Sequence, residues 1–216
     1  MNATKKLYPY LTRETWEEAK ADLMKRDRIL RKLVPKLGDM NLEKPNDPFM
    51  TLARSIVGQQ ISVKAADAVW QRLMTNCKQK CTPSSFLRMS KTTLSECGLP
   101  KRKIEYLCDL AKKFKEKQVK HQNWASMNDI EVGEELMSIR GIGRWTADMF
   151  LIFNMLRTDI LPLDDLGLLK AISLNYFSGE PISRSDARDV AQNWTPWCTV
   201  ATWYLWRSLD PIPVEY

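Results

Sequence analysis

Histidine is nearly absent from this 216-residue chain, which contains only His121, and cysteine is scarce. A single imidazole excludes every site that needs two histidine ligands. The thiols are odd in number and irregularly spaced, so they match neither a disulfide framework nor the four closely spaced ligands of a zinc or iron–sulfur site. We therefore expect five reduced, structural cysteines: Cys77, Cys81, Cys97, Cys108 and Cys198.

Long apolar runs are missing as well. Polar residues interrupt every hydrophobic stretch well before the roughly 20 residues that a membrane-spanning helix needs. Met1 is followed by Lys5, Lys6 and a Tyr-Pro-Tyr turn, without the apolar core of a secretory signal. These features favour an intracellular protein that does not enter a membrane.

Acidic residues are outnumbered, because 26 Asp and Glu face 33 Lys and Arg, for a net charge of +7. A basic surplus favours polyphosphate partners, since each neutralised phosphate releases condensed counterions. Charge alone is weak support for nucleic-acid binding, because many basic proteins never meet a nucleic acid.

Alternating strand patterns are rare and helical periodicity fills most of the chain, so we predict an all-α fold. Thr15 and Glu18 have the spacing of a capping box at the first helix, and Ser62 is placed to cap a long amphipathic helix. Further helices are expected at Arg28–Leu37, Pro48–Gly58, Ser84–Met89, Thr92–Cys97, Lys103–Lys117, Asp129–Ser138, Asp165–Phe177, Ser183–Asn193 and Pro196–Leu209.

The most informative segment, Leu136–Ala147, has the pattern of a helix, a tight Gly-Ile-Gly turn and a second helix. Gly141 and Gly143 permit backbone conformations closed to other residues. They also let a phosphate approach the amides at the start of the second helix, where Arg144 can add a charge-assisted contact. An ordinary αα-hairpin would show the same glycine spacing.

The complete string Leu-x-x-Ile-x-Gly-Ile-Gly-Arg-Trp-Thr-Ala resembles the helix-hairpin-helix of DNA repair glycosylases, and the DNA-3-methyladenine glycosylase II group in particular. The resemblance implies that the hairpin contacts DNA through Arg140, Gly141, Ile142, Gly143, Arg144 and Thr146. Twenty residues after Trp145, the string Leu-Pro-Leu-Asp-Asp-Leu-Gly resembles the segment with the superfamily's catalytic aspartate. It implies that Asp165 is catalytic and that Asp164 lies in the substrate pocket. A carboxylate at a helix start also serves as a cap, and we expect that role for Asp164 rather than Asp165.

Two upstream segments agree with this resemblance. Residues 58–62, Gly-Gln-Gln-Ile-Ser, resemble the turn that plugs the gap left by a flipped nucleotide. They imply DNA contacts from Gln59, Gln60 and Ser62, with Gln60 as the plug, and a plain polar helix junction is the alternative. A further stretch resembles the family's basic loop and implies DNA contacts from Lys101, Arg102 and Lys103. Three consecutive cations suit a phosphate track, but a solvated helix start would explain them equally well.

The segment from Trp194 to Trp206 resembles the family's C-terminal helix. Cys198 stands where an arginine is frequent, which puts the contact made by that arginine in doubt. We expect the four tryptophans of this segment to be core residues rather than a stacking platform.

Trp145 indicates which reaction to expect. In glycosylases that also nick DNA, a lysine stands at this point and attacks the sugar, so the resemblance implies a monofunctional enzyme. It would flip out an alkylated purine, such as 3-methyladenine or 7-methylguanine, and hydrolyse the N-glycosidic bond in the first step of base excision repair. An indole suits a cationic base, and Asp165 would stabilise the positive sugar and orient water. A buried helix residue is the alternative for Trp145.

The family's motif order implies two helical lobes with a cleft between them. One lobe is expected at residues 46–156, ending in the hairpin, and the other combines residues 1–45 with 157–216. No redox cofactor or catalytic metal is implied, although the hairpin carbonyls can hold a monovalent cation. We expect a monomer that acts on double-stranded DNA, in the cytoplasm with a bacterial nucleoid or in a eukaryotic nucleus.

Two other functions stay open at this point. The first is a glycosylase for an oxidised or mismatched base, against which Trp145 and the missing cluster cysteines argue. The second is a DNA-binding module that uses the hairpin without chemistry.

Overall fold

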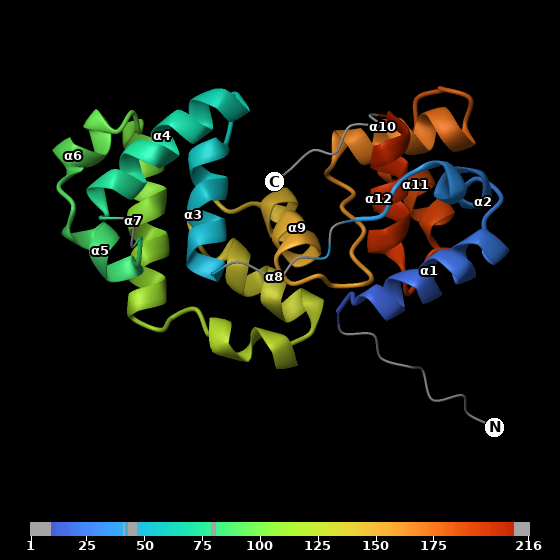
Figure 1. Cartoon of the computed structure of the whole chain (residues 1–216), viewed down its shortest axis with the longest axis horizontal. Helices are drawn as coiled ribbons and strands as arrows, with labels where there is room; N and C mark the ends of the chain where they lie inside the picture. Colours follow the sequence, from blue (N-terminus) through green and yellow to red (C-terminus); the bar gives the residue numbers. More distant parts are fainter. Residues whose placement is uncertain (1–9, 41, 43–46, 79–80, 210–216) are drawn as a thin grey trace. The chain divides into compact units, whose positions relative to one another are not determined.

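The computed structural model describes residues 10–40, 42, 47–78 and 81–209. Within these ranges the regular elements are helices and no strand occurs, so the all-α prediction is confirmed (Figure 1). None of the described helices is long and apolar enough to cross a membrane. No described cluster of three or more His, Cys, Asp or Glu side chains could hold a metal ion.

The chain divides into two compact units, and each is described by itself. Unit 1 comprises Met1–Lys44 and Leu151–Tyr216, and unit 2 comprises Pro45–Phe150. The lobe boundary predicted between residues 45 and 46 lies outside the described residues. The chain returns to unit 1 after Phe150, and the second predicted boundary, between 156 and 157, lies a little further along.

Unit 2 is built around a long central helix. Helix α7 (Lys101–Lys115) packs against α3 (Pro48–Gly58), α5 (Pro83–Arg88) and α6 (Lys91–Glu96). The remaining elements are α4 (Val63–Asn76), the 3-10 helix η2 (His121–Ser126), α8 (Asp129–Met137) and the beginning of α9 (Arg144–Phe153). An aromatic core joins them, since Phe114 meets Phe49 edge-on at 5.6 Å and Trp124 meets Phe150 edge-on at 5.4 Å.

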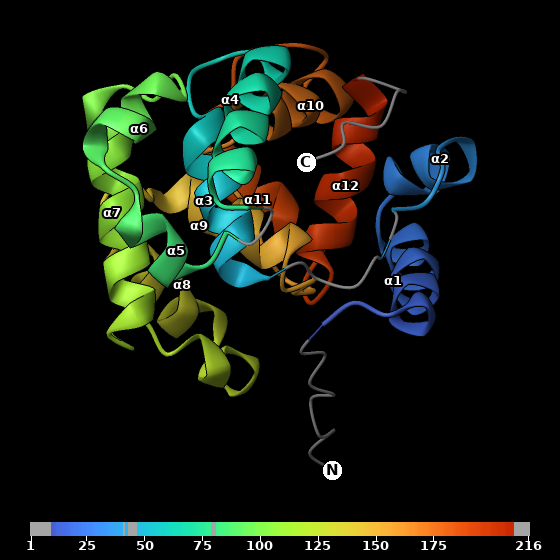
Figure 2. The same ribbon diagram turned by 60° about the vertical axis from the view of Figure 1, so that its left-hand side comes forward.

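Unit 1 packs helices from the first and last parts of the described chain against one another. Helix α12 (Cys198–Leu209) packs on α1 (Arg13–Arg26), α2 (Leu30–Leu33) and α10 (Leu166–Tyr176). Figures 1 and 2 show α1 and α2 beside α12. The unit also contains the 3-10 helix η1 (Val34–Lys36) and α11 (Arg184–Ala191). Trp194 and Trp197 are buried in its core, as predicted, whereas Trp203 and Trp206 are half-buried.

Local side-chain caps begin several of the helices, and one of the two predicted caps is wrong. Ser62 caps α4 as predicted, with its hydroxyl accepting from the amide of Ala65 at 3.3 Å. The capping box of α1 is formed by Thr12 and Thr15, not by Thr15 and Glu18. Thr12 has the extended backbone of a cap residue, and the Thr15 hydroxyl accepts its amide at 2.7 Å, which places Thr15 inside the first turn.

The five cysteines are free thiols, and four of them are buried: Cys77, Cys81, Cys97 and Cys198. Burial, together with the neighbouring Cys77 thiol, raises the pKa of Cys81 to about 12. The Cys81 thiol therefore stays protonated at neutral pH, and the buried cysteines act as small core residues.

Candidate DNA interface and catalytic carboxylate

The predicted helix-hairpin-helix is formed by α8, the turn at residues 138–143 and α9. Gly141 has a φ of 87°, and a Cβ there would lie 2.2 Å from Cδ2 of Tyr106. Glycine is therefore required at this position by backbone conformation and by close packing. Gly143 differs, because its φ is not positive and a Cβ would meet nothing within 4 Å. The expectation that both glycines adopt a special conformation is wrong for Gly143, which instead leaves open space beside the start of α9.

A second turn, between α3 and α4, is attached to the hairpin. The side-chain amide of Gln59 donates to the Gly141 carbonyl at 2.9 Å. Gln60, the predicted plug, has a φ of 59°, a left-handed conformation that is uncommon for a residue with a side chain. The structure thus gives Gln59 an internal partner and holds the backbone of Gln60 in a strained conformation at the tip of the turn.

The three predicted basic residues form the first turn of α7, not a loop. Lys103 donates to the Val57 carbonyl at the end of α3, with an Nζ–O distance of 2.7 Å. Burial lowers the pKa of its ammonium group. Arg102 lies over the Tyr106 ring, 5.5 Å from its centroid, and its Nε donates to the Tyr106 hydroxyl. Lys103 therefore supports the α3 end of the Gln59–Gln60 turn, and its phosphate contact stays a prediction.

These three segments line one cavity of about 640 Å³ in unit 2. Helix α7, the Gln59–Gln60 turn and the hairpin contribute its walls. The lining residues are Gln59, Gln60, Pro100, Arg102, Lys103, Tyr106, Gly141, Ile142, Gly143, Trp145 and Thr146. Most of the residues that the sequence predicted to contact DNA are thereby brought together on one hollowed surface, the hairpin cavity.

Trp145 lines the hairpin cavity with 39% of its surface exposed, so the alternative that it is simply a buried helix residue is wrong. Three predicted cationic contacts are not part of the lining: Lys101, Arg140 and Arg144. Arg144 pairs with the buried carboxylate of Asp148 at 2.9 Å, although its own side chain is half exposed. The backbone amide of Arg140 donates to the Asp109 carboxylate at 2.9 Å, and this bond attaches the hairpin turn to α7.

The candidate catalytic carboxylate lies in unit 1, at the start of α10. Asp165 is the cap of this helix, and its Oδ1 accepts the Leu168 amide at 2.6 Å. The same oxygen accepts the indole N–H of Trp206 at 2.8 Å. The expectation that Asp164 would be the cap is wrong, because the first α-helical residue is Leu166 and the cap position falls on Asp165. Asp164 is exposed and forms an ion pair with Arg184 at 2.7 Å.

A family model described as the HhH-GPD superfamily of base excision DNA repair proteins matches residues 53–196. The chain belongs to this superfamily. The match includes the Gln59–Gln60 turn, the hairpin and Asp165.

Individual relatives agree with this HhH-GPD assignment. DNA-3-methyladenine glycosylase 1 of Schizosaccharomyces pombe is 30% identical over 84% of this chain and 82% of its own. The crystal structure of a DNA-3-methyladenine glycosidase from Bacillus halodurans has a TM-score of 0.83 at 30% identity and covers 89% of both chains. A Schizosaccharomyces pombe 3-methyladenine DNA glycosylase in complex with abasic DNA has a TM-score of 0.76 at 28% identity, over 91% of this chain and 100% of that one.

Two residues of the HhH-GPD chain were missed by sequence reasoning. Tyr106 lies under Gly141, and Trp206 donates to Asp165. Tyr106 follows Arg102 by one helical turn, in the segment that resembles the family's basic loop, and this spacing was the signal available for it. Trp206 was counted only as one of four clustered tryptophans. Cys198, noted for its unusual position, is buried at the start of α12, where its amide donates to Asp159 at 3.2 Å.

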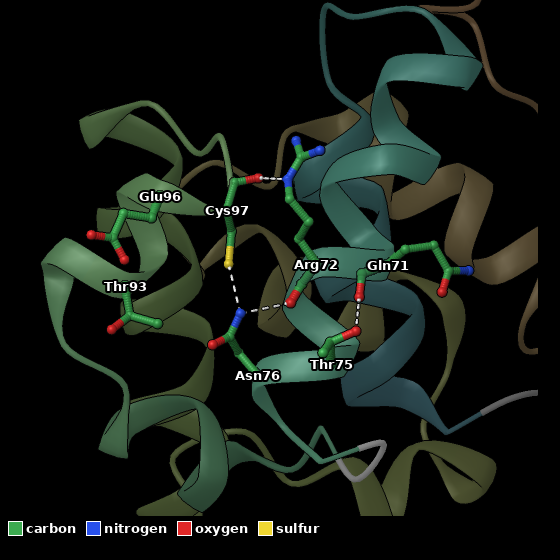
Figure 3. A pocket seen from close by; sticks show the side chains of 7 residues that line it. All are labelled: Gln71, Arg72, Thr75, Asn76, Thr93, Glu96 and Cys97. Carbon is green, nitrogen blue, oxygen red and sulfur yellow. Dashed lines mark hydrogen bonds between the residues drawn. The ribbon is translucent and has the colours of Figure 1, made fainter.

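A second hollow of unit 2, about 270 Å³, lies between α4 and α6 (Figure 3). Several of its polar groups are bonded to one another. Arg72 donates to the Cys97 carbonyl at 2.8 Å, and the Asn76 amide bridges the Arg72 carbonyl at 2.9 Å and the Cys97 sulfur at 3.4 Å (Figure 3). These hydrogen bonds join α4 to the residue that follows α6.

Proposed function

We propose that this protein is a monofunctional DNA glycosylase that excises alkylated purines, of the 3-methyladenine and 7-methylguanine type, from duplex DNA. The observation that carries the proposal is the hairpin cavity with an exposed Trp145, in an HhH-GPD chain that also presents Asp165 at a helix start. The names of its relatives, DNA-3-methyladenine glycosylases, support the choice of lesion.

The hairpin cavity is suited to a DNA backbone. Gly143 leaves room for a phosphate near the first amides of α9, where the helix dipole favours an anion. Arg102 and Lys101 add positive charge from the first turn of α7. Gln60 stands at the tip of the neighbouring turn, and there it would replace the flipped nucleotide in the stack.

The chemistry would depend on Asp165. Loss of a cationic alkylated base leaves positive charge on the deoxyribose, and a fixed carboxylate stabilises that charge and orients the attacking water. Charge-assisted hydrogen bonds to Oδ1 hold the group in place. Trp145 offers an aromatic face to a cationic base and has no amine, so we propose that no Schiff base forms and the abasic strand stays intact.

The reaction as proposed needs no redox cofactor or catalytic metal, and the protein acts as a monomer wherever the cell keeps its DNA. A monovalent cation at the hairpin would supply positive charge between backbone carbonyls and a phosphate. The Ile139 carbonyl accepts a hydrogen bond from the Ile142 amide at 3.1 Å, and the Gly141 carbonyl accepts one from the Gln59 side chain. A carbonyl oxygen has a second lone pair, so these bonds are compatible with such an ion.

The test is release of free base from methylated duplex DNA, measured by chromatography. We expect the wild type to release 3-methyladenine and 7-methylguanine, and Asp165→Asn to lose about 100- to 10,000-fold in rate. Asparagine is as good a helix cap as aspartate, so Asp165→Asn should fold and should bind an abasic-analogue duplex normally. Asp189→Asn, at an exposed aspartate of α11 in the same unit, should behave as the wild type.

Four results would contradict parts of the proposal. No base released by the wild type removes the alkylpurine assignment, and release only from duplexes with oxidised or mismatched bases would replace it with another lesion. Full activity of Asp165→Asn removes the role of the carboxylate. A strand break without added base or heat would show that the enzyme is not monofunctional.

A further inference from the structure

The Asp165 carboxylate receives donors from two different helices. The Leu168 amide belongs to the first turn of α10, the helix that Asp165 itself caps, and its N–Oδ1 distance is 2.6 Å. The Trp206 indole belongs to α12, 41 residues further along, and its Nε1–Oδ1 distance is 2.8 Å. Both donors bind the same oxygen.

A cap bond alone would not fix this carboxylate. The terminal torsion of an aspartate is broad and roughly two-fold, so one bond to Oδ1 leaves the plane of the group free to turn about it. A second N–H approaching the same oxygen from another helix restricts that rotation. The position of Oδ2 is then determined as well, because it is set by the plane of the carboxylate.

The indole is itself held in place. Its ring stacks on Phe153 at a centroid distance of 5.9 Å with an angle of 16° between the planes. Gly167 leaves space beside it, since a Cβ there would lie 3.0 Å from Oδ1 of Asp165 and 3.6 Å from Nε1 of Trp206. Stacking and the missing side chain together direct the N–H at the carboxylate.

We propose that Trp206 is a positioning residue, whose indole N–H holds the Asp165 carboxylate in the one orientation used for hydrolysis of the glycosidic bond. The inference rests on the proposed function, because it gives a purpose to a carboxylate that acts on the sugar. A group that acts through space on a developing charge must be correctly placed, and a displacement of about 1 Å costs about 100-fold in rate.

The test separates the hydrogen bond from the packing. Trp206→Phe removes the N–H donor and keeps an aromatic ring against Phe153. Trp203→Phe is the matched control, since Trp203 lies on the same helix and its indole donates to the Gly38 carbonyl at 3.5 Å, away from Asp165. The single-turnover rate is measured on a duplex with one 7-methylguanine, and affinity on a duplex with an abasic analogue.

We expect Trp206→Phe to lower the single-turnover rate about 10- to 100-fold, with affinity and thermal midpoint close to those of Trp203→Phe. Trp203→Phe should keep the wild-type rate. An unchanged rate in Trp206→Phe overturns the inference. Equal losses of rate and affinity also overturn it, because they would mean that the indole contacts the DNA rather than the carboxylate.

A spectroscopic measurement tests the contact without any substrate. The chain has eight tryptophans, and the indole N–H signal of Trp206 in a nitrogen-15 spectrum is assigned by its loss in Trp206→Phe. Asp165→Ala should shift that signal and speed its exchange with solvent, while the Trp203 signal stays in place. An unshifted Trp206 signal refutes the hydrogen bond. Failure of the wild type to release any base refutes the proposed function instead, so the two failures are distinguishable.

Discussion

Replacing Gly141 by alanine would place a methyl group in the hairpin turn where the fold leaves no room for one. The backbone at this position has a φ of 87°, and a left-handed conformation costs a residue with a Cβ about 1–2 kcal/mol. The new Cβ would also lie 2.2 Å from Cδ2 of Tyr106 and 2.7 Å from Cε2. Crowding of this kind in a packed site costs about 1–3 kcal/mol.

The Tyr106 ring is not free to move aside. Its hydroxyl accepts from Arg102, whose guanidinium also lies over the ring at 5.5 Å from the centroid. Alanine restricts the unfolded chain more than glycine does, which offsets about 0.4–1 kcal/mol of the cost. We expect Gly141→Ala to lower the free energy of unfolding by about 1–4 kcal/mol and to weaken DNA binding, because the turn must distort.

Urea denaturation followed by circular dichroism measures the first effect. Gly143→Ala is the matched control, since a Cβ there meets nothing within 4 Å and the φ is not positive. It should change the free energy of unfolding by less than about 1 kcal/mol and still weaken DNA binding, because the methyl group occupies the space left for a phosphate.

A double-mutant cycle divides the cost at Gly141 into its two parts. In a Tyr106→Ala background the crowding is gone, so Gly141→Ala should cost only the strain of the backbone, about 1–2 kcal/mol. The reasoning is refuted if Gly141→Ala is as stable as the wild type, or if its cost is the same with and without the Tyr106 ring.

Two further predictions concern charged groups. Lys101→Met and Lys103→Met should each weaken DNA binding and reduce the slope of log K against log salt by about 1, because each removes one predicted phosphate contact. An unchanged slope in Lys103→Met would show that its ammonium serves only the Val57 carbonyl. Burial raises the pKa of Asp39, but hydrogen bonds from Tyr204 at 2.7 Å and Lys20 at 3.0 Å outweigh burial and hold the pKa below its ordinary value. The resulting stabilisation is present above the ordinary aspartate pKa of about 3.9 and is lost as pH falls through the lower folded value. Asp39→Asn should therefore flatten the acid-side decline in the free energy of unfolding, and a decline as steep as that of the wild type would contradict this assignment.

Local signals were sufficient for much of the helical structure. The range predicted for α3, Pro48–Gly58, is the range observed, because Pro48 occupies the first turn and Asp47 caps it through the Met50 amide. Where two residues competed for a cap, local signals were ambiguous. Thr15 had the spacing for a capping box with Glu18, and its hydroxyl bonds Thr12 instead.

The candidate site, like the helices, could be predicted from the sequence only in part. The resemblance of the hairpin and of the Asp164–Asp165 segment was enough to name residues that the structure places around one cavity and at one helix start. It favoured the wrong aspartate as the cap of α10, left a buried Trp145 open as an alternative, and did not indicate that Lys103 turns toward α3. The Lys103 contact depends on how α7 packs against α3, which no spacing within a motif records.

The sequence by itself determined the all-α class, the hairpin and the carboxylate at the start of α10, because periodicity, caps and glycine turns act over a few neighbouring residues. Only the tertiary structure decided that Tyr106 packs under Gly141 and that Trp206 holds Asp165. Each of those contacts joins residues far apart in the chain. Such contacts are set by the packing of whole helices, to which every buried side chain contributes.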